Sequence, residues 1–351
     1  MQALRLALMQ AWGRDARWPY PVLSYLLWPI SAVFAVLVAI RRTLYRRGLL
    51  SQHRLPVPVL VVGNVMVGGV GKTPIVMALV QHLTQQGWRV GVVSRGYGRS
   101  NAHMIKRVQA DSTAQEVGDE PLLIARNCQV PVCVGSDRVA AAQALLAQHP
   151  EVQVLVCDDG LQHLALARDL ELVVFDERGT GNGYLLPAGP LREPWPRQAS
   201  VGRDVPSWVL KTSGQAGPDE WAVQRSLANF AVQADGTQRP LSSWGARPVQ
   251  ALAGIAKPEV FFAMLREQGM HLCHTQALAD HAELHALHID ASQGDVLCTE
   301  KDAVKLWAHH PHAWAVPLQT TLPTELLAAI DLHLAQAQHA KLSSPHGHQT
   351  A

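Results

Sequence analysis

The sequence predicts an α/β fold in which a largely parallel sheet carries helices on both faces. Between residues 56 and 178, short β-branched runs alternate with helical patterns, which is typical of a parallel sheet buried on both sides. The alternation resumes after a segment rich in glycine and proline, residues 178–206, and indicates a second, smaller α/β domain. Because 351 residues exceed what one hydrophobic core usually organises, we expect two domains.

The amino-terminal segment predicts a membrane-associated helix. Val22 to Ile40 contains no charged residue, and its length is near the lower limit for crossing a hydrocarbon core of about 30 Å. Four arginines follow directly, at Arg41, Arg42, Arg46 and Arg47. They would attract anionic headgroups and keep the following domain in the cytoplasm. A single span and a helix lying in the interface both fit this pattern.

The elements of the first domain follow from hydrophobic periodicity. We expect strands at Val57–Val62, Arg89–Val93, Val130–Val134, Val152–Cys157 and Leu170–Asp176. We expect helices at Pro74–Gln86, Glu120–Asn127 and Asp137–Gln148. In parallel sheets, ligands bind beyond the carboxyl ends of the strands, so the polar residues at those ends are the candidates for a site.

A glycine-rich loop joins the first of these strands to the first helix. From Gly63 to Pro74 it reads Gly-Asn-Val-Met-Val-Gly-Gly-Val-Gly-Lys-Thr-Pro, and this context of strand, Gly-Lys-Thr loop and helix defines a P-loop, which binds nucleotide phosphates. The fold is therefore expected to be of the P-loop NTPase type. Lys72 would reach the β- and γ-phosphates, and the Thr73 hydroxyl would bind Mg²⁺.

The predicted nucleotide-binding residues are Met66, Val67, Gly68, Gly69, Val70, Gly71, Lys72 and Thr73. The P-loop motif has glycine at the position of Met66. We expect the adjacent glycines 68 and 69 to supply the flexibility of the loop instead.

Two aspartates follow the fourth expected strand. Asp158 and Asp159 stand at the strand tip, where P-loop proteins place a carboxylate that holds Mg²⁺ directly or through water. Both are predicted metal ligands together with Thr73. Asp119 precedes a helix, and the spacing leaves two roles open: a helix cap, or the base that accepts the proton of a substrate hydroxyl. Arg192, in the proline-rich loop, is a candidate clamp for the transferred phosphoryl group.

A second α/β region follows this loop. Its expected strands are Trp208–Lys211, Phe230–Gln233, Val249–Leu252, Val296–Thr299 and Trp314–Val316. Its expected helices are Pro258–Gln268, Ala282–Leu287, Lys301–Ala308 and Thr324–His339. We therefore divide the chain into a membrane-associated helix (1–50), a P-loop domain (51–206), a second α/β domain (207–339) and a disordered tail (340–351).

Composition narrows the choice of partners. A formal net charge of +2 gives no overall field for nucleic acid, so we expect no nucleic-acid partner. The five cysteines include no Cys-x-x-Cys pair, which argues against a zinc site and against disulfides.

A series of motifs resembles the tetraacyldisaccharide 4′-kinase family of lipid A biosynthesis. After the apolar helix come Val-Gly-Asn-x4-Gly-x-Gly-Lys-Thr-Pro, Ser-Arg-Gly-Tyr-Gly-Arg, Gly-Asp-Glu-Pro and Asp-Asp-Gly-x-Gln-His. They are followed by Leu-Pro-Ala-Gly-Pro-Leu-Arg-Glu-Pro, Ala-Gly-Ile-x-x-Pro and Thr-Glu-Lys-Asp-Ala-Val. The motifs extend from about residue 12 to residue 306, so the resemblance covers nearly the whole chain.

The resemblance implies an ATP- and Mg²⁺-dependent kinase at the cytoplasmic face of the bacterial inner membrane. Its lipid substrate would be tetraacyldisaccharide 1-phosphate, phosphorylated at the 4′-hydroxyl, and no obligate protein partner is implied. Asp119 would be the base and His281 its partner, while Lys72 and Arg192 would act on phosphate. The substrate side would be lined by Arg138, Gln162 and Glu193. Members of the family commonly carry Asp-His-His near His281, whereas Ala282 replaces the second histidine here.

Two other functions compete with this interpretation. A partitioning ATPase or other nucleotide switch would share the loop, but those proteins place a lysine just before the glycine pair, where this chain has Val67. A membrane-bound nucleotide sensor without kinase activity would not need the Arg192 loop or the paired aspartates. We therefore favour the kinase and keep a P-loop ATPase or switch as the alternative.

Overall fold

The computed structural model describes residues 2–14, 20–197, 205–278 and 294–343. The chain divides into two compact units: unit 1 comprises residues 1–72, 153–223 and 323–351, and unit 2 comprises residues 73–152 and 224–322. Parallel strands and helices alternate in both units, so the predicted α/β class is confirmed. The domain limits expected from the sequence stay a prediction.

Unit 1 contains five parallel strands in the order β5-β1-β6-β7-β8. Their bounds are Val59–Gly63 (β1), Val154–Asp158 (β5), Leu170–Phe175 (β6), Ser207–Lys211 (β7) and Glu220–Ala222 (β8). Every residue of β1, β5 and β6 is buried, as expected for β-branched strands covered on both faces. The carboxyl ends of β1 and β5, at Gly63 and Asp158, therefore meet at one edge of this sheet.

Two of the expected second-region elements belong to unit 1 instead. β7 pairs in parallel with β6, because its apolar residues extend the buried sheet. The carboxyl-terminal helix α9, Thr324–Leu342, is held to the start of β6: His333 Nε2 lies 2.8 Å from the Asp169 carbonyl oxygen, and Lys341 Nζ lies 3.1 Å from the Asp169 carboxylate. α9 ends at Leu342, slightly beyond the helix expected at Thr324–His339.

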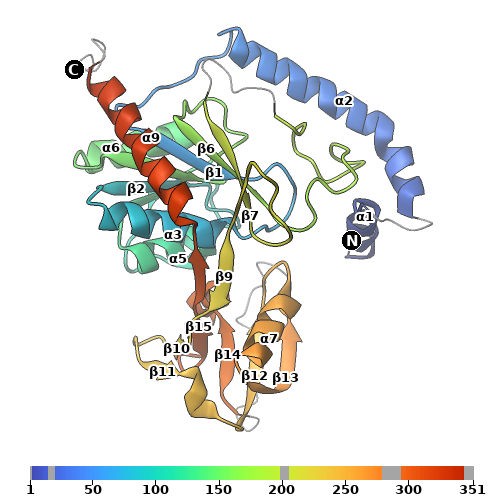
Figure 1. Ribbon diagram of the computed structural model, residues 1–351, viewed down its shortest axis with the longest axis vertical. Coiled ribbons are helices and arrows are strands. Elements are labelled where there is room, and N and C mark those ends of the chain that lie inside the picture. The colour runs from blue at the N-terminus through green and yellow to red at the C-terminus, as the bar shows by residue number, and fades with distance from the viewer. Residues whose placement is uncertain (1, 15–19, 198–204, 279–293, 344–351) are drawn as a thin grey trace. The chain divides into compact units, whose positions relative to one another are not determined.

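Unit 1 also contains the amino-terminal helices α1, Gln2–Ala11, and α2, Tyr20–Arg46, the latter drawn in blue in Figure 1. α2 is longer than the expected run and includes Pro29. With a mean hydropathy of 2.2 over its most apolar window, of which 11% is buried, α2 is long and apolar enough to cross a membrane. Exposed apolar side chains, such as that of Leu26 (70% exposed), lie along it.

Unit 2 begins with the helix that follows the P-loop. Its first part contains the strands β2 (Val90–Ser94), β3 (Lys106–Arg107) and β4 (Val132–Val134), with β4 between the parallel β2 and the antiparallel β3. The helices are α3 (Lys72–Gln85), α4 (Ala114–Val117), α5 (Asp119–Cys128) and α6 (Arg138–Gln148). Each expected strand and helix of this stretch is confirmed to within a few residues.

The second part of unit 2 is a six-stranded sheet in the order β11-β10-β15-β14-β12-β13. Its strands are β10 (Phe230–Val232), β11 (Gln238–Pro240), β12 (Pro248–Ala253), β13 (His271–Ala277), β14 (Val296–Thr299) and β15 (Trp314–Val316). A 3₁₀ helix, η1 (Leu241–Trp244), and the helices α7 (Pro258–Glu267) and α8 (Glu300–Leu306) accompany them, and Figure 1 shows α7 beside β12 and β13. The sheet packs around Trp244, whose ring meets that of Trp314 edge-on at 5.3 Å between centroids.

β9, Gln224–Leu227, and β16, Leu318–Thr321, pair in a separate antiparallel two-stranded sheet. In the sequence, β9 comes before the strands of the six-stranded sheet and β16 comes after them. β3, β8, β9, β11, β13 and β16 were not expected from the sequence. Most of them are short and partly exposed, and they lack the apolar run on which the strand predictions depend. The helix expected at Ala282–Leu287 lies outside the described residues.

Candidate functional site

The P-loop occupies the carboxyl edge of β1. β1 ends at Gly63 and α3 begins at Lys72, so the predicted succession of strand, loop and helix is confirmed. Gly68 and Gly71 have φ angles of 99° and 80°, in the region that favours glycine. The loop is also held from outside, because Arg178 Nη2 donates to the Gly69 carbonyl at 3.1 Å and Thr212 Oγ1 donates to the Val70 carbonyl at 3.1 Å.

The structure explains why Met66 can stand where the motif has glycine. Left-handed backbone falls on Gly68 and Gly71, whereas the Met66 side chain is 1% exposed and belongs to the core. The Met66 backbone pairs with Leu191 in an antiparallel bridge, and its carbonyl accepts from Asn64 Nδ2 at 2.8 Å. Met66 therefore anchors the loop to the proline-rich segment and leaves the curvature to the glycines.

Two cations converge on one carboxylate beside the loop. Lys72 Nζ lies 3.4 Å and Arg192 Nη1 lies 3.5 Å from Asp159 Oδ1. Lys72 Nζ also donates to Asn64 Oδ1 at 3.2 Å. The Asp159 side chain is 27% exposed and its backbone is left-handed, with φ at 51°, so its carboxylate remains accessible at the turn after β5. Unit 1 thus brings together three of the residues predicted for phosphate and metal.

The oxygen donors at this edge fit Mg²⁺. Asp158 ends β5 with only 1% of its surface exposed, Asp159 follows it, and Thr73 stands next to Lys72 at the start of α3. Mg²⁺ takes hard oxygen ligands and usually binds one or two carboxylates together with waters and phosphate oxygens. Within the described parts of the chain, no group of three or more His, Cys, Asp or Glu side chains could enclose a metal by itself. The set therefore suits a metal that arrives with a nucleotide.

The proline-rich loop brings Gln162 and Glu193 close to the P-loop. Arg192 N donates to the Val65 carbonyl at 2.7 Å, which aligns this part of the loop with the strand exit. Gln162 Nε2 donates to the Asn64 carbonyl at 3.1 Å and to Glu193 Oε1 at 2.8 Å. Glu193 is 4% exposed, so it contributes to the site from a buried position.

Asp119 lies in unit 2 as the first residue of α5. The residue that precedes the helix is Gly118, so Asp119 occupies the first helical position and not the N-cap position. The carboxylate is 3% exposed and faces two lysines of α8: Lys305 Nζ lies 3.1 Å and Lys301 Nζ lies 4.0 Å from Asp119 Oδ2. Ammonium groups at these distances favour the charged form of a carboxylate, whereas burial opposes it.

The α8 residues are placed by a motif with a clear structural role. Thr299 caps α8 and donates to Asp302 Oδ2 at 2.6 Å, and Asp302 Oδ2 also accepts from Gly254 N at 2.9 Å. Burial raises the pKa of Asp302, while these hydrogen bonds lower it. Glu300 binds Asn127 Nδ2 at 2.8 Å, which fastens α8 to α5. The Thr-Glu-Lys-Asp sequence thus holds its lysine against Asp119.

Arg138 is buried at the start of α6, in unit 2. It is 5% exposed, and its Nη1 donates to the carbonyls of Gly135 and Ser136 at 3.1 and 3.0 Å. These bonds orient the guanidinium at the carboxyl end of β4, the edge at which ligands bind in parallel sheets. His281 lies outside the described residues.

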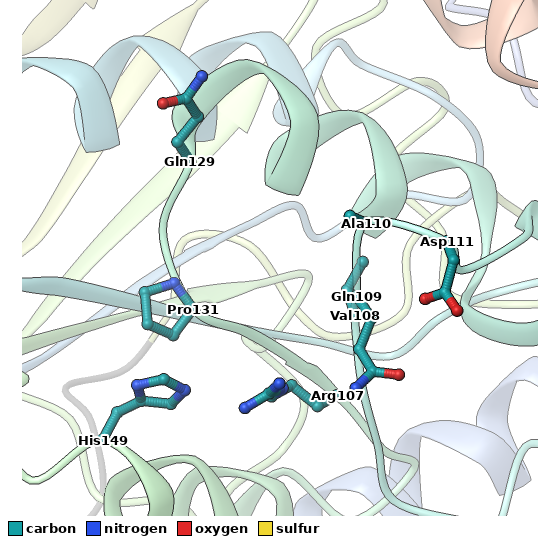
Figure 2. A pocket seen from close by; sticks show the side chains of 8 residues that line it. All are labelled: Arg107, Val108, Gln109, Ala110, Asp111, Gln129, Pro131 and His149. Atoms are coloured by element: carbon teal, nitrogen blue, oxygen red, sulfur yellow. The ribbon is translucent and has the colours of Figure 1, made fainter.

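A shallow pocket of about 480 Å³ opens elsewhere in unit 2 (Figure 2). It is lined by Arg107, Val108, Gln109, Ala110, Asp111, Gln129, Pro131 and His149. Pro131 directly precedes β4, so the pocket lies toward the amino end of that strand. None of the predicted site residues lines it, and ligands of parallel sheets bind at the opposite ends of the strands.

Taken together, the P-loop at the edge of β1, the aspartates after β5 and the parallel strands define a P-loop nucleotide-binding α/β protein. The family described as tetraacyldisaccharide-1-P 4′-kinase matches residues 23–335. This chain belongs to that family.

Similar proteins agree with this assignment. A tetraacyldisaccharide 4′-kinase of Acidovorax ebreus is 51% identical over 314 residues, which cover 89% of this chain and 91% of the relative. Another, of Polaromonas naphthalenivorans, is 49% identical over 352 residues and covers 99% of this chain and 100% of the relative. Among solved structures, the "apo" form LpxK of Aquifex aeolicus in complex with ATP matches with a TM-score of 0.74 and 28% identity, covering 89% of this chain and 99% of that one.

Several residues that organise the site were not predicted from the sequence. Lys301 and Lys305 lie within or just after a recognised motif, yet no role was assigned to them. Asn64, whose Oδ1 accepts a hydrogen bond from Lys72 Nζ, belongs to the P-loop motif itself. Arg42 was interpreted only as a headgroup contact, but it is paired with a buried glutamate. For Asn64 and Lys301 the available signal was their place inside a recognised motif, whereas Arg42 has no local signal that separates it from Arg41.

Proposed function

We propose that this protein transfers the γ-phosphoryl group of ATP to the 4′-hydroxyl of tetraacyldisaccharide 1-phosphate in lipid A biosynthesis. The observation that carries this proposal is the convergence of Lys72 and Arg192 on Asp159 at the P-loop edge, in a chain that belongs to this kinase family. The relative from Aquifex aeolicus was crystallised with ATP, which supports ATP as the nucleotide.

The P-loop would bind the triphosphate through backbone N–H groups and the amino end of α3. Lys72, now held by Asn64 and Asp159, would turn to the β- and γ-phosphates, and Arg192 would neutralise charge that develops on the transferred group. Thr73, Asp158 and Asp159 would hold Mg²⁺, which supplies charge neutralisation on the phosphates.

Asp119 would accept the proton of the sugar hydroxyl, with His281 as its partner. Its support is the buried carboxylate that faces Lys305 and Lys301. A base of this kind must be deprotonated before transfer, and the two ammonium groups favour that state. Arg138, Gln162 and Glu193 would line or support the substrate side.

The acceptor is a lipid, and α2 would bring the enzyme to it. The exposed apolar side chains of α2 and the arginines that follow the apolar run support attachment at the cytoplasmic face of the inner membrane. Either a span or an interfacial position would serve this purpose. The proposal requires no nucleic acid and no obligate protein partner.

Transfer of label from [γ-³²P]ATP to tetraacyldisaccharide 1-phosphate in mixed micelles tests the proposal. The full-length protein should label the acceptor in a Mg²⁺-dependent reaction, and an acceptor already phosphorylated at the 4′ position should remain unlabelled. Hydrolysis of ATP without any labelled acceptor would contradict the proposal and would favour a nucleotide switch.

A further inference from the structure

α2 is joined to the site loop by a buried ion pair. Arg42 Nη1 lies 2.6 Å from Glu193 Oε2, and the two side chains are only 12% and 5% exposed. Burial lowers the pKa of Arg42, and the Glu193 carboxylate raises it. The neighbouring Arg41 is exposed and rests on the Tyr45 ring, so the two adjacent arginines of one helix have different environments.

The other oxygen of Glu193 leads to the P-loop. Glu193 Oε1 accepts from Gln162 Nε2 at 2.8 Å, and the same amide donates to the Asn64 carbonyl at 3.1 Å. Gln162 Oε1 lies 3.4 Å from Arg192 Nη1. Gln162 therefore contacts the residue that holds Lys72 and the arginine predicted to act on phosphate, and its own orientation depends on Glu193.

Glu193 is fixed from a third direction by the interior of unit 1. Arg197 Nε lies 3.1 Å from Glu193 Oε2, and Arg197 also pairs with Glu171 of β6. Arg168 Nη1 in turn lies 3.2 Å from Glu171 Oε1. Three buried arginines thus share two buried glutamates, and loss of one cation removes a partner from a carboxylate that cannot be hydrated, so its neighbours must rearrange.

Two hydrogen bonds to backbone carbonyls connect the same parts of unit 1. Ser31 Oγ of α2 donates to the Leu185 carbonyl at 2.8 Å, and Val67 N of the P-loop donates to the Pro190 carbonyl at 2.9 Å. One segment, residues 185–193, therefore contacts the membrane-associated helix on one side and the P-loop on the other. A change in the position of α2 against residues 185–193 can therefore be transmitted to the nucleotide site through an unbroken series of packed polar groups.

We propose that Arg42 is a positioning residue of the nucleotide site: through Glu193 it orients Gln162, and with it Asn64 and Arg192, so that the seating of α2 sets the affinity for ATP. The inference deepens the proposed function and rests on it for the identity of the nucleotide. It gives α2 a second role beside membrane attachment, and it makes Glu193 a support of Gln162 instead of a substrate contact.

The test is the dissociation constant of a non-hydrolysable ATP analogue with Mg²⁺, measured by calorimetry on the full chain in micelles of a non-ionic detergent. Arg42→Ala should weaken binding about tenfold, which is the usual size of coupling between residues of one hydrogen-bonded network. Arg42→Lys retains the charge without the planar fork and should weaken binding about threefold. Arg41→Ala removes the same charge from an exposed position of the same helix and should leave binding within about twofold of wild type.

A double-mutant cycle separates positioning from general destabilisation. In a Gln162→Ala background, Arg42→Ala should have little further effect on analogue binding, because its route to the P-loop is already broken. Fully additive effects would overturn the inference, as would wild-type binding by both Arg42→Ala and Arg42→Lys. If Arg42→Ala does not fold, Arg42→Lys decides by the same criterion. Because the measurement needs no acceptor, binding in the expected pattern without acceptor phosphorylation would overturn the proposed function and leave this inference standing.

Discussion

Two carboxylates of this protein each lie near two cations, yet their surroundings differ. Asp159, in unit 1, is 27% exposed, and its partners Lys72 and Arg192 stand at 3.4 and 3.5 Å. Asp119, in unit 2, is 3% exposed, and Lys305 stands at 3.1 Å. The ion pairs of Asp159 are therefore slightly longer, and the carboxylate is in partial contact with solvent. The ion pair of Asp119 with Lys305 is shorter, and the carboxylate is enclosed by protein.

The difference in burial suits the two groups to different work. Ion pairs whose carboxylate is in contact with solvent can exchange partners more easily than enclosed ones, so Lys72 and Arg192 can leave Asp159 for phosphate while a metal takes their place. A buried pair resists such exchange, because an unpaired buried charge is costly. Asp119 is therefore suited to receive a proton at a fixed position, and Asp159 is suited to an exchange of ligands.

Loss of the P-loop lysine should have the largest effect. Lys72→Ala removes the ammonium that would neutralise the β- and γ-phosphates, so we expect kcat/KM for ATP to fall about a thousandfold. Lys106→Ala is a matched control, because Lys106 pairs with Glu116 on the surface of unit 2. Steady-state kinetics of acceptor phosphorylation measures both, and comparable losses in the two variants would refute the assignment of Lys72.

A smaller effect is expected from the lysine beside Asp119. Lys305→Met removes the cation at 3.1 Å, which disfavours the ionised carboxylate, so the acidic limb of the pH–rate profile should move to higher pH. Activity at neutral pH should fall about tenfold or less. Lys301→Met, at 4.0 Å, should shift the limb less. An unchanged profile in the Lys305 variant would show that this pair does not control the base.

No effect on activity is expected in the last comparison, which uses the reactivity of cysteine thiols to measure burial in unit 2. Burial raises the pKa of Cys128 to about 12 and that of Cys298 well above the ordinary value, whereas Cys273 is exposed. Since the thiolate is the reactive form, a disulfide reagent at pH 8 should label Cys273 about a hundredfold faster than Cys128 or Cys298 in the native protein. Equal rates, read by peptide mass spectrometry, would mean that the region around α5 and α8 is open.

Local sequence signals predicted the P-loop edge well. β1, the loop and α3 follow one another directly, so motif and periodicity together located Lys72, Thr73 and the strand that precedes them. Asp158 and Asp159 were located for the same reason, because a buried strand ends there. In such cases the chemistry depends on neighbours in sequence.

Relations between distant segments could not be predicted in the same way. Arg42 and Glu193 are separated by 151 residues, and nothing local distinguishes Arg42 from Arg41. The pairing of Lys305 with Asp119 depends on the packing of α8 against α5, and the parallel pairing of β7 with β6 depends on the sheet as a whole. These contacts arise from tertiary packing, which periodicity and motif spacing do not encode.

The contrast between the two carboxylates is tested most directly by a pair of conservative variants, Asp159→Asn and Asp119→Asn. For each, binding of MgATP and transfer to the lipid acceptor are measured on the same preparation. Asp159→Asn should lose most of the Mg²⁺-dependent part of ATP binding, while Asp119→Asn should bind MgATP as wild type does and lose about a hundredfold or more in transfer. Wild-type transfer by Asp119→Asn, or equal losses of MgATP binding in the two variants, would contradict the division of roles.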